Sequence, residues 1–428
     1  MLEMIMYMII GIVDIAVVGH LGAIPLAAVS LGAEIFFGIA LALSALGVGA
    51  GIIIAQAWGA NNLEEVSQVV GFTYLGGMLL GLVCGGLGFV FTPQIVGLFP
   101  LEAAVYHETV TYLRILFIAA PLALTMHTVN PLFRGLGRTD IPMKIAFITN
   151  SFNIIACVLL VYGLWGLPRL EVAGSALATA LAYGLGFIII TIVMLKGKTG
   201  IKLSWPRLRS GAQKQLSDLF SLGVPSLTEE TLRFASSIIS SFLITSLGTV
   251  AFAAHNVAIN VESLSFMPGT GIAMAATTLV GQAVGAANYE RARAAARGCF
   301  ELTGIIMCGF GLVFALFPET IAHVFTSDAA IIGLAGLCIR ISSLEQITMA
   351  LDMVLGGTLR GIGDTRTPMY ISLFFTWVFR LPLMYLLSQV WMASIAYIWI
   401  LFVIDWFLRG VTYLVIFRKK SWFTPIKE

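Results

Sequence analysis

The stretch RGLGRTDIPM at residues 134–143 recurs as RGIGDTRTPM at residues 360–369. We call the shift from position 134 to position 360 the repeat offset. The same offset aligns Leu21-Gly22 with Leu247-Gly248, and QAWGANN (56–62) with QAVGAAN (282–288). A single ungapped offset over about 120 residues indicates an internal duplication rather than chance. We therefore expect a chain of two similar halves.

The composition of both halves is that of a membrane protein. Of the 428 residues, 59% are apolar and 11% are charged, and the mean hydropathy is +0.96. Soluble proteins are about 25% charged, and a membrane-spanning helix needs roughly 20 apolar residues. The apolar runs predict an all-α integral membrane protein with twelve transmembrane helices, at residues 1–18, 26–57, 66–91, 105–128, 142–164, 172–195, 217–246, 251–283, 293–317, 329–356, 368–389 and 393–417.

Each half contains six of these helices, so both halves enter the membrane from the same side and form parallel repeats. The sequence divides into an N-lobe (1–195), a basic linker (196–216), a C-lobe (217–417) and a basic tail (418–428). Two such lobes are typical of secondary transporters, and we find no selectivity-filter sequence of a channel.

Lysine and arginine residues predict the orientation, because they favour cytoplasmic loops. With the N-terminus in the cytoplasm, eighteen of the 24 lie in cytoplasmic segments and one, Arg169, lies outside. The other five lie within predicted helices: Arg114, Arg233, Arg340, Arg380 and Arg409. We expect a multi-pass protein of the inner (cytoplasmic) membrane with both termini cytoplasmic, and a first helix that is not removed as a signal peptide.

Several other classes of function are disfavoured by the sequence. The net charge of +2 gives no reason to expect a nucleic-acid partner. The triplet Gly197-Lys198-Thr199 lacks the glycine that a phosphate-binding loop needs at position 192, so we expect no nucleotide. The five cysteines lack metal-binding spacing, and neither HExxH nor DDxxD occurs. We therefore expect no enzyme activity and no cofactor.

Four strings resemble the multidrug and toxic compound extrusion (MATE) family. They are VDIAVVGHLG (13–22), the run from Ser246 to Asn288, LRGIGDTRTPM (359–369) and the pattern Trp377-x-x-Arg380-x-Pro382. The resemblance is strongest to the bacterial DinF-like and NorM-like branches. It implies two six-helix lobes forming a V, and export of amphipathic, often cationic xenobiotics driven by inward flow of H⁺ or Na⁺. Many relatives carry an Asp one turn after an Asn in the fifth helix, where this chain has Asn153 and then Cys157.

Acidic residues inside the predicted helices are candidates for cation coupling, because a carboxylate at the bilayer centre costs roughly 2.5–3.5 kcal/mol. Asp14 has no counter-charge three or four residues away. Asn150 and Asn153 are expected to hydrogen-bond it across the N-lobe. A proton and a cationic substrate would compete for this carboxylate. In the alternative interpretation, Asp14 is held by such contacts for structure only.

Other charged residues of the helices fall into two groups. Glu262 and Asp352 lack local counter-charges, and we consider both as coupling residues, with Asp352 as the candidate for Na⁺ and no other metal site expected. Glu34 and Glu345 also lack such partners. The spacing of Asp405 with Arg409, and of Glu229 and Glu230 with Arg233, predicts local ion pairs instead.

The substrate pocket has weaker sequence signals. Met267-Pro268-Gly269 predicts a break in the eighth helix. Met-rich surfaces repack around varied ligands. The candidates for an adaptable pocket are therefore Met267 and Met274, with Glu34, Phe36, Phe37 and Phe266. For each of the apolar side chains, the alternative is packing in the core or against lipid.

We therefore expect a secondary active antiporter that works by alternating access and exports amphipathic or cationic small molecules, with H⁺ favoured over Na⁺ as the coupling ion. One chain with two lobes should suffice, so we expect a monomer in the lipid bilayer. The alternative is a lipid-linked oligosaccharide flippase of the same wider superfamily.

Overall fold

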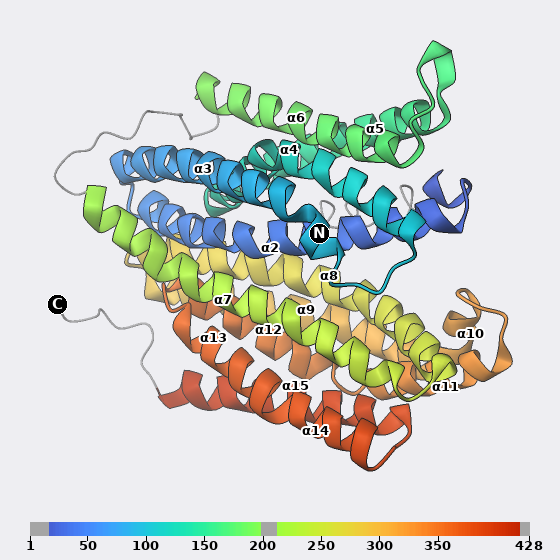
Figure 1. The fold of residues 1–428 in the computed structure, drawn as a ribbon. Helices are drawn as coiled ribbons and strands as arrows, with labels where there is room; N and C mark the ends of the chain where they lie inside the picture. The colour runs from blue at the N-terminus through green and yellow to red at the C-terminus, as the bar shows by residue number, and fades with distance from the viewer. Residues whose placement is uncertain (1–16, 198–211, 420–428) are drawn as a thin grey trace. The chain divides into compact units, whose positions relative to one another are not determined.

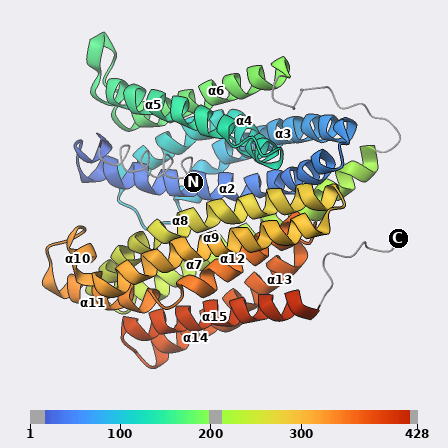
Figure 2. The same ribbon diagram turned by 180° about the vertical axis from the view of Figure 1, so that it is seen from behind.

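The computed structural model describes residues 17–197 and 212–419, with side chains in 17–197 and 216–418. Every regular element in these ranges is helical, which confirms the all-α prediction. The long helices are α2 (Ala23–Gly59), α3 (Leu63–Val96), α4 (Ala103–Gly135), α5 (Asp140–Tyr162), α6 (Glu171–Lys196), α7 (Ala212–Thr245), α8 (Thr249–Gly285), α9 (Tyr289–Leu316) and α15 (Ile395–Lys419) (Figure 1, Figure 2). The shorter elements are η1 (Leu164–Gly166), α10 (Pro318–His323), α11 (Ala329–Ser342), α12 (Gln346–Gly361), α13 (Arg366–Leu373), η2 (Phe374–Arg380), α14 (Leu381–Tyr385) and η3 (Leu386–Val390).

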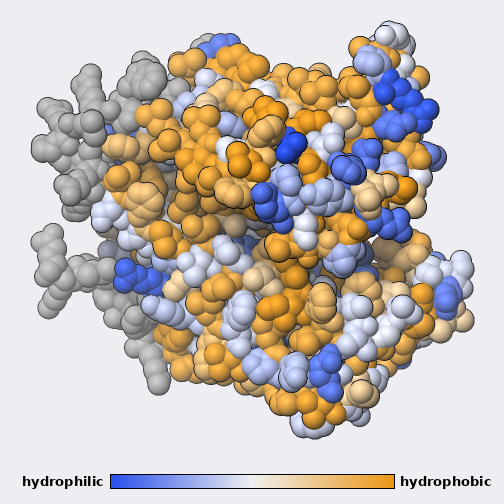
Figure 3. All heavy atoms as spheres, in the orientation of Figure 1, coloured by the Kyte–Doolittle hydropathy of each residue, from blue (hydrophilic) through white to orange (hydrophobic). Residues whose placement is uncertain are grey.

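The helices have the length and polarity of membrane spans. In the described ranges, nine segments are long and apolar enough to cross a bilayer, and the bent pair of α11 and α12 makes a tenth. Helix α7 is also long enough but carries Glu229, Glu230 and Arg233. Most of the predicted first helix, 1–18, lies outside the described residues. Hydrophobic residues cover most of the coloured surface in Figure 3, as contact with lipid requires. The chain is thus a multi-pass membrane protein.

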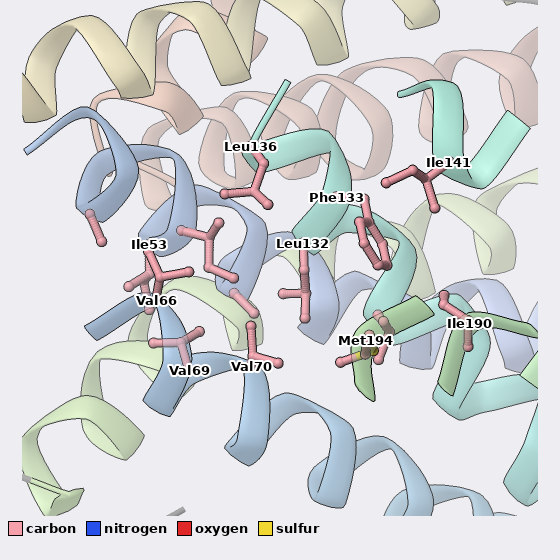
Figure 4. Packing of buried hydrophobic residues seen from close by; sticks show 14 of the residues in the cluster. Ile53, Val66, Val69, Val70, Leu132, Phe133, Leu136, Ile141, Ile190 and Met194 are labelled. Carbon is pink, nitrogen blue, oxygen red and sulfur yellow. The ribbon is translucent and has the colours of Figure 1, made fainter. Parts of the chain in front are cut away.

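The first unit of the fold (within residues 17–227) contains α2 to α6 and the start of α7. Helix α3 packs along α4, and α6 packs on both α4 and α5. Apolar side chains from all five helices meet in one core, which Figure 4 shows from close by. Its members include Ile53, Val66, Val69, Val70, Leu132, Phe133, Leu136, Ile141, Ile190 and Met194.

The second unit (residues 228–419) contains the remainder of α7 and all helices from α8 onward. Helix α8 packs on α9, α11 and α12, and α15 packs on α11 and α12. Trp399 of α15 is fully buried in its core. The Trp399 ring lies 5.6 Å from that of His255 on α8. This packing brings polar residues of α8, α12 and α15 into the interior of the unit.

The backbone confirms the duplication. Positive φ angles recur at positions related by the repeat offset: Gly22 (126°) with Gly248 (102°), Asn61 (57°) with Ala287 (52°), and Gly137 (77°) with Gly363 (94°). The caps of α3 and α9 are equivalent too, because Asn62 accepts a hydrogen bond from the Glu65 N–H and Asn288 accepts one from the Arg291 N–H. The two repeats therefore share turns and helix starts as well as sequence.

Two predicted features of the helices are wrong. The helix expected at 329–356 is broken, because α11 ends at Ser342, α12 begins at Gln346, and their axes differ by 55°. The break expected at Pro268 is absent, and α8 is continuous from Thr249 to Gly285. Close packing holds α8 there, since a Cβ atom at Gly269 would lie 2.8 Å from the sulfur of Met353. Neighbouring helices commonly support proline inside membrane helices in this way.

The contact between α3 and α4 gives a test of the fold. A Cβ atom at Gly81 would lie 2.4 Å from the Cα atom of Pro121, whereas one at Gly86 would meet no heavy atom within 4 Å. We predict that Gly81→Ala lowers the free energy of unfolding by about 1–3 kcal/mol through overpacking. Gly86→Ala should leave it unchanged or raise it by about 0.5–1 kcal/mol. Thermal unfolding in detergent measures both, and equal effects would contradict the close α3–α4 contact.

Candidate functional site

The break between α11 and α12 positions a buried carboxylate in the second unit. Glu345 immediately precedes α12, and its side chain is fully buried. Among the described residues, no nitrogen or hydroxyl group donates a hydrogen bond to either of its carboxylate oxygens. Glu345 interacts electrostatically with Glu262, which projects from α8. Broken helices at membrane depth commonly form ion sites in transporters, so these two residues, which we call the acid pair, are the first part of the candidate site.

Two arginines and a third acid adjoin the acid pair. Arg380, at the end of η2, interacts electrostatically with Glu262 and Glu345, and its Nε lies 3.7 Å from Oδ2 of Asp405. Arg409 Nε lies 3.1 Å from the same Asp405 oxygen, one turn along α15. Arg409 also donates a hydrogen bond from Nη2 to Thr376 Oγ1 at 2.8 Å. We call Glu262, Glu345, Arg380, Asp405 and Arg409 the charge cluster.

Aromatic rings form one wall of the charge cluster. The Arg380 guanidinium lies over the Phe402 ring, 4.1 Å from its centroid, and the Arg409 guanidinium lies 5.3 Å from that of Trp406. The rings of His255 and Phe402 meet edge to face at 6.3 Å. These rings attract the cations and exclude water from them, which strengthens electrostatic interactions inside the cluster.

The charge cluster contains one more acid than it has bases. Its three carboxylates face two guanidinium groups, and Arg409 and Asp405 pair with each other. Arg380 is then the one arginine of the cluster that adjoins both carboxylates of the acid pair. A buried charge that lacks a partner is costly, so a monovalent cation at the acid pair would balance the cluster. The arrangement can therefore bind and release one proton.

Asp352 lies next to the cluster on α12 and is half-buried. It interacts electrostatically with Arg409 and Arg360, two cations that disfavour a metal ion beside it. Arg360 binds both carboxylate oxygens of Glu229 at 2.8 Å. The carboxylates of Glu229 and Asp405 interact with Asp352 as well. In the described residues, however, no group of three or more His, Cys, Asp or Glu side chains could hold a metal ion.

The local ion pairs expected from spacing are confirmed for Asp405 with Arg409 and for Glu230 with Arg233. Glu229 also interacts electrostatically with Arg233, but the cation that it binds through hydrogen bonds is Arg360. Glu229 and Arg360 are 131 positions apart in the sequence. Helix–helix packing creates their contact, and no spacing rule within one helix could find it.

The first unit holds a polar cluster at equivalent positions of the repeat. Asn153 of α5 donates a hydrogen bond to Thr179 Oγ1 of α6 at 3.2 Å. Asn150 is also buried, and its Nδ2 has no acceptor among the described residues. The repeat offset relates Asn150 to Thr376 and Thr179 to Asp405. Asp14, the predicted partner of both asparagines, lies outside the described residues. Both units therefore place polar groups between their fifth and sixth helices.

Four of the predicted substrate contacts are divided between the two units. In the first unit, Glu34 and Phe37 of α2 are exposed. In the second, Met274 of α8 is 38% exposed and Met267 is half-buried. Their exposure agrees with contact to a ligand or to lipid. Phe36, in contrast, is 4% exposed and packs on Phe117 in the core.

Comparison with known proteins gives the family. The sequence matches the MatE family model over residues 1–159 and 225–386, which is most of the chain. A probable multidrug resistance protein NorM of Thermotoga maritima is 29% identical over 98% of this chain and 90% of its own length. The multidrug resistance protein NorM of Aliivibrio fischeri is 29% identical over 89% of this chain and 82% of its own length.

Solved structures share the fold. A transporter of the MOP superfamily from Pyrococcus furiosus has a TM-score of 0.89 at 22% identity, over 97% of this chain and 92% of that one. The matches span both repeats and the turns that join their helices. Together with the duplicated helical fold and the motifs at 134–143 and 360–369, they show that this chain belongs to the MATE family of membrane transporters, in its NorM-like branch.

Proposed function

We propose that this protein exports amphipathic or cationic small molecules from the cytoplasm in exchange for an inward-moving cation, with H⁺ favoured over Na⁺. The observation that carries the proposal is the acid pair: within the described part of the chain, no nitrogen or hydroxyl group donates to the fully buried Glu345, and the charge cluster has one carboxylate in excess. Relatives with the name of multidrug resistance protein support export of varied compounds.

The acid pair would couple the two fluxes through its change of charge. The transporter would alternate between an inward-open and an outward-open orientation, and a bound cation and a bound substrate would each stabilise a different one. Each ligand can shift the equilibrium between the two orientations only by the difference between its affinities for them. When the cation binds from outside, the charge cluster becomes neutral and the inward step is favoured. When the cation leaves to the cytoplasm, the substrate binds and the outward step follows.

Three features of the site favour H⁺. Two carboxylates that interact closely can share a single proton. In the described residues, no group of three or more His, Cys, Asp or Glu side chains could hold a metal ion, and one of the charged groups that interact with Glu345 is the cation Arg380. Asp352, the Na⁺ candidate, interacts with two arginines. Asp14, with Asn150 and Asn153, would form a second coupling site in the first unit.

The setting of the transporter follows from the same proposal. With eighteen Lys and Arg residues on the side of both termini, the positive-inside rule places those termini in the cytoplasm. Transport across the inner membrane needs only the two units of one chain, so we propose that the monomer is the working form.

Dye flux in proteoliposomes tests the function directly. Ethidium, a fluorescent lipophilic cation, is followed under an imposed pH gradient and then under an imposed Na⁺ gradient. We expect the pH gradient to drive flux, and Asp14→Asn to lower it by about tenfold or more if the carboxylate couples the ions. Flux driven only by Na⁺ would contradict the choice of H⁺. A folded protein that moves no dye under either gradient would contradict drug export and leave lipid-linked sugars as the substrates to try.

A further inference from the structure

Arg380 interacts with two groups of acids in the second unit. The first is the acid pair, Glu262 and Glu345, with which it interacts electrostatically. The second is Asp405, whose Oδ2 lies 3.7 Å from the Arg380 Nε. No acceptor in the described ranges lies in hydrogen-bond geometry with that Nε. The contact of Arg380 with Asp405 is therefore electrostatic and not fixed by a directional bond at this nitrogen.

Asp405 has a second and closer cation. Arg409 Nε lies 3.1 Å from Asp405 Oδ2, and the Arg409 side chain is 7% exposed. The hydrogen bond from Arg409 to Thr376 and the Trp406 ring keep the Arg409 guanidinium in place. Because Arg409 neutralises Asp405, the charge of Arg380 remains available to the acid pair.

The surroundings of Arg380 allow it to move. Its guanidinium lies over the Phe402 ring at 4.1 Å, and attraction to a ring face does not depend on one hydrogen-bond direction. Its backbone is the last residue of η2, a π-helical segment from Phe374. Segments of π-helix are short, and they frequently occur at functional sites. A second one, η3 (Leu386–Val390), follows in the same span.

We propose that Arg380 is a positioning residue that alternates between the acid pair and Asp405, and so links the occupancy of the pair to the position of the span 366–390. A cation bound at the pair removes one of its two negative charges and so weakens the attraction that holds Arg380 there, and Arg380 moves towards Asp405. When the cation leaves, Arg380 returns and offsets one of the two carboxylate charges, and the transporter can carry its substrate outward without a bound cation. The inference deepens the proposed function and depends on it.

The variant Arg380→Ala separates coupling from substrate movement. Without the guanidinium, the acid pair should retain its cation throughout the cycle. We expect ethidium export driven by a pH gradient to fall by about tenfold or more. Exchange of labelled for unlabelled ethidium without a gradient uses only the substrate-loaded step, and it should stay within about twofold of the wild type.

Restoration of the charge distinguishes this role from a structural one. Millimolar guanidinium should restore part of the export by Arg380→Ala and leave the wild type unchanged, and Arg380→Lys should export better than Arg380→Ala. The matched control is Arg340→Ala, because Arg340 pairs with Glu319 at an exposed position and its loss should leave both measurements near wild type.

If the wild type exports ethidium, two results would overturn the role of Arg380 and leave the proposed function intact. One is wild-type export by Arg380→Ala. The other is an equal loss of export and exchange that neither guanidinium nor lysine restores. A wild-type protein that exports under neither gradient would overturn the proposed function as well, so the two failures are distinguishable.

Discussion

Glu345→Gln is expected to abolish gradient-driven export, with a fall of about tenfold or more, in a protein that folds at least as well as the wild type. Glutamine has the shape of glutamate but carries no charge. The remaining Glu262 would then be balanced by Arg380, which interacts with both members of the acid pair. The charge cluster would no longer need a cation, and the gradient would have nothing to act on.

The measurement is ethidium efflux from proteoliposomes beside thermal unfolding in detergent. Glu301→Gln is the matched control, because Glu301 binds Arg297 with its side chain 56% exposed, and it should export within about twofold of wild type, as expected for an exposed pair. Unchanged export by Glu345→Gln would show that the acid pair does not couple the cation to export. A large loss of stability would instead assign Glu345 a structural role.

Arg409→Met is expected to have the largest effect on stability, about 3–5 kcal/mol of unfolding free energy, because it leaves a buried carboxylate without its closest partner. Asp405 is fully buried, and Arg409 lies 3.1 Å away. Thr376 would also lose its donor. The loss of unfolding free energy is measured by thermal unfolding in detergent, with the fraction of monodisperse protein as the readout.

A double variant tests the reason for that loss. Asp405→Leu combined with Arg409→Met removes both buried charges and should recover most of the stability, because apolar groups of similar volume replace buried ion pairs at little cost. Arg297→Met, at a pair whose side chains are 82% and 56% exposed, should cost less than about 1 kcal/mol. A double variant no better than Arg409→Met alone would show that packing, rather than charge, holds this part of α15.

The architecture could be predicted from sequence because its signals are long and repeated. Apolar runs mark the helices, and the repeat offset predicts equivalent turns that the positive φ angles of Gly22 and Gly248 confirm. The break between Ser342 and Gln346 could not be found, because the sequence there contains neither proline nor glycine. Conversely, Pro268 signals a break that close packing around Gly269 prevents.

The candidate site could be predicted only in part. Charges within apolar helices identify Glu262 and Asp352 without any knowledge of their neighbours. Glu262 interacts with Glu345 and Arg380, and Asp352 interacts with Arg409, all of which belong to other elements of the fold. Glu345 became a candidate only because the helix break buries it. Arg380 became one because it interacts with both the acid pair and Asp405. Such features depend on tertiary packing, which a single sequence does not display.

The central claim, that a cation leaves the acid pair when the substrate binds, is tested most directly by proton release. Ethidium is added to the detergent-solubilised protein in weakly buffered solution, and a pH-indicator dye reports the protons released. We predict release of about one proton per protein at the acid pair, in keeping with the reciprocity of coupled binding, and none from Glu345→Gln. Ethidium binding without proton release in the wild type, or with the same release in the variant, would contradict the account.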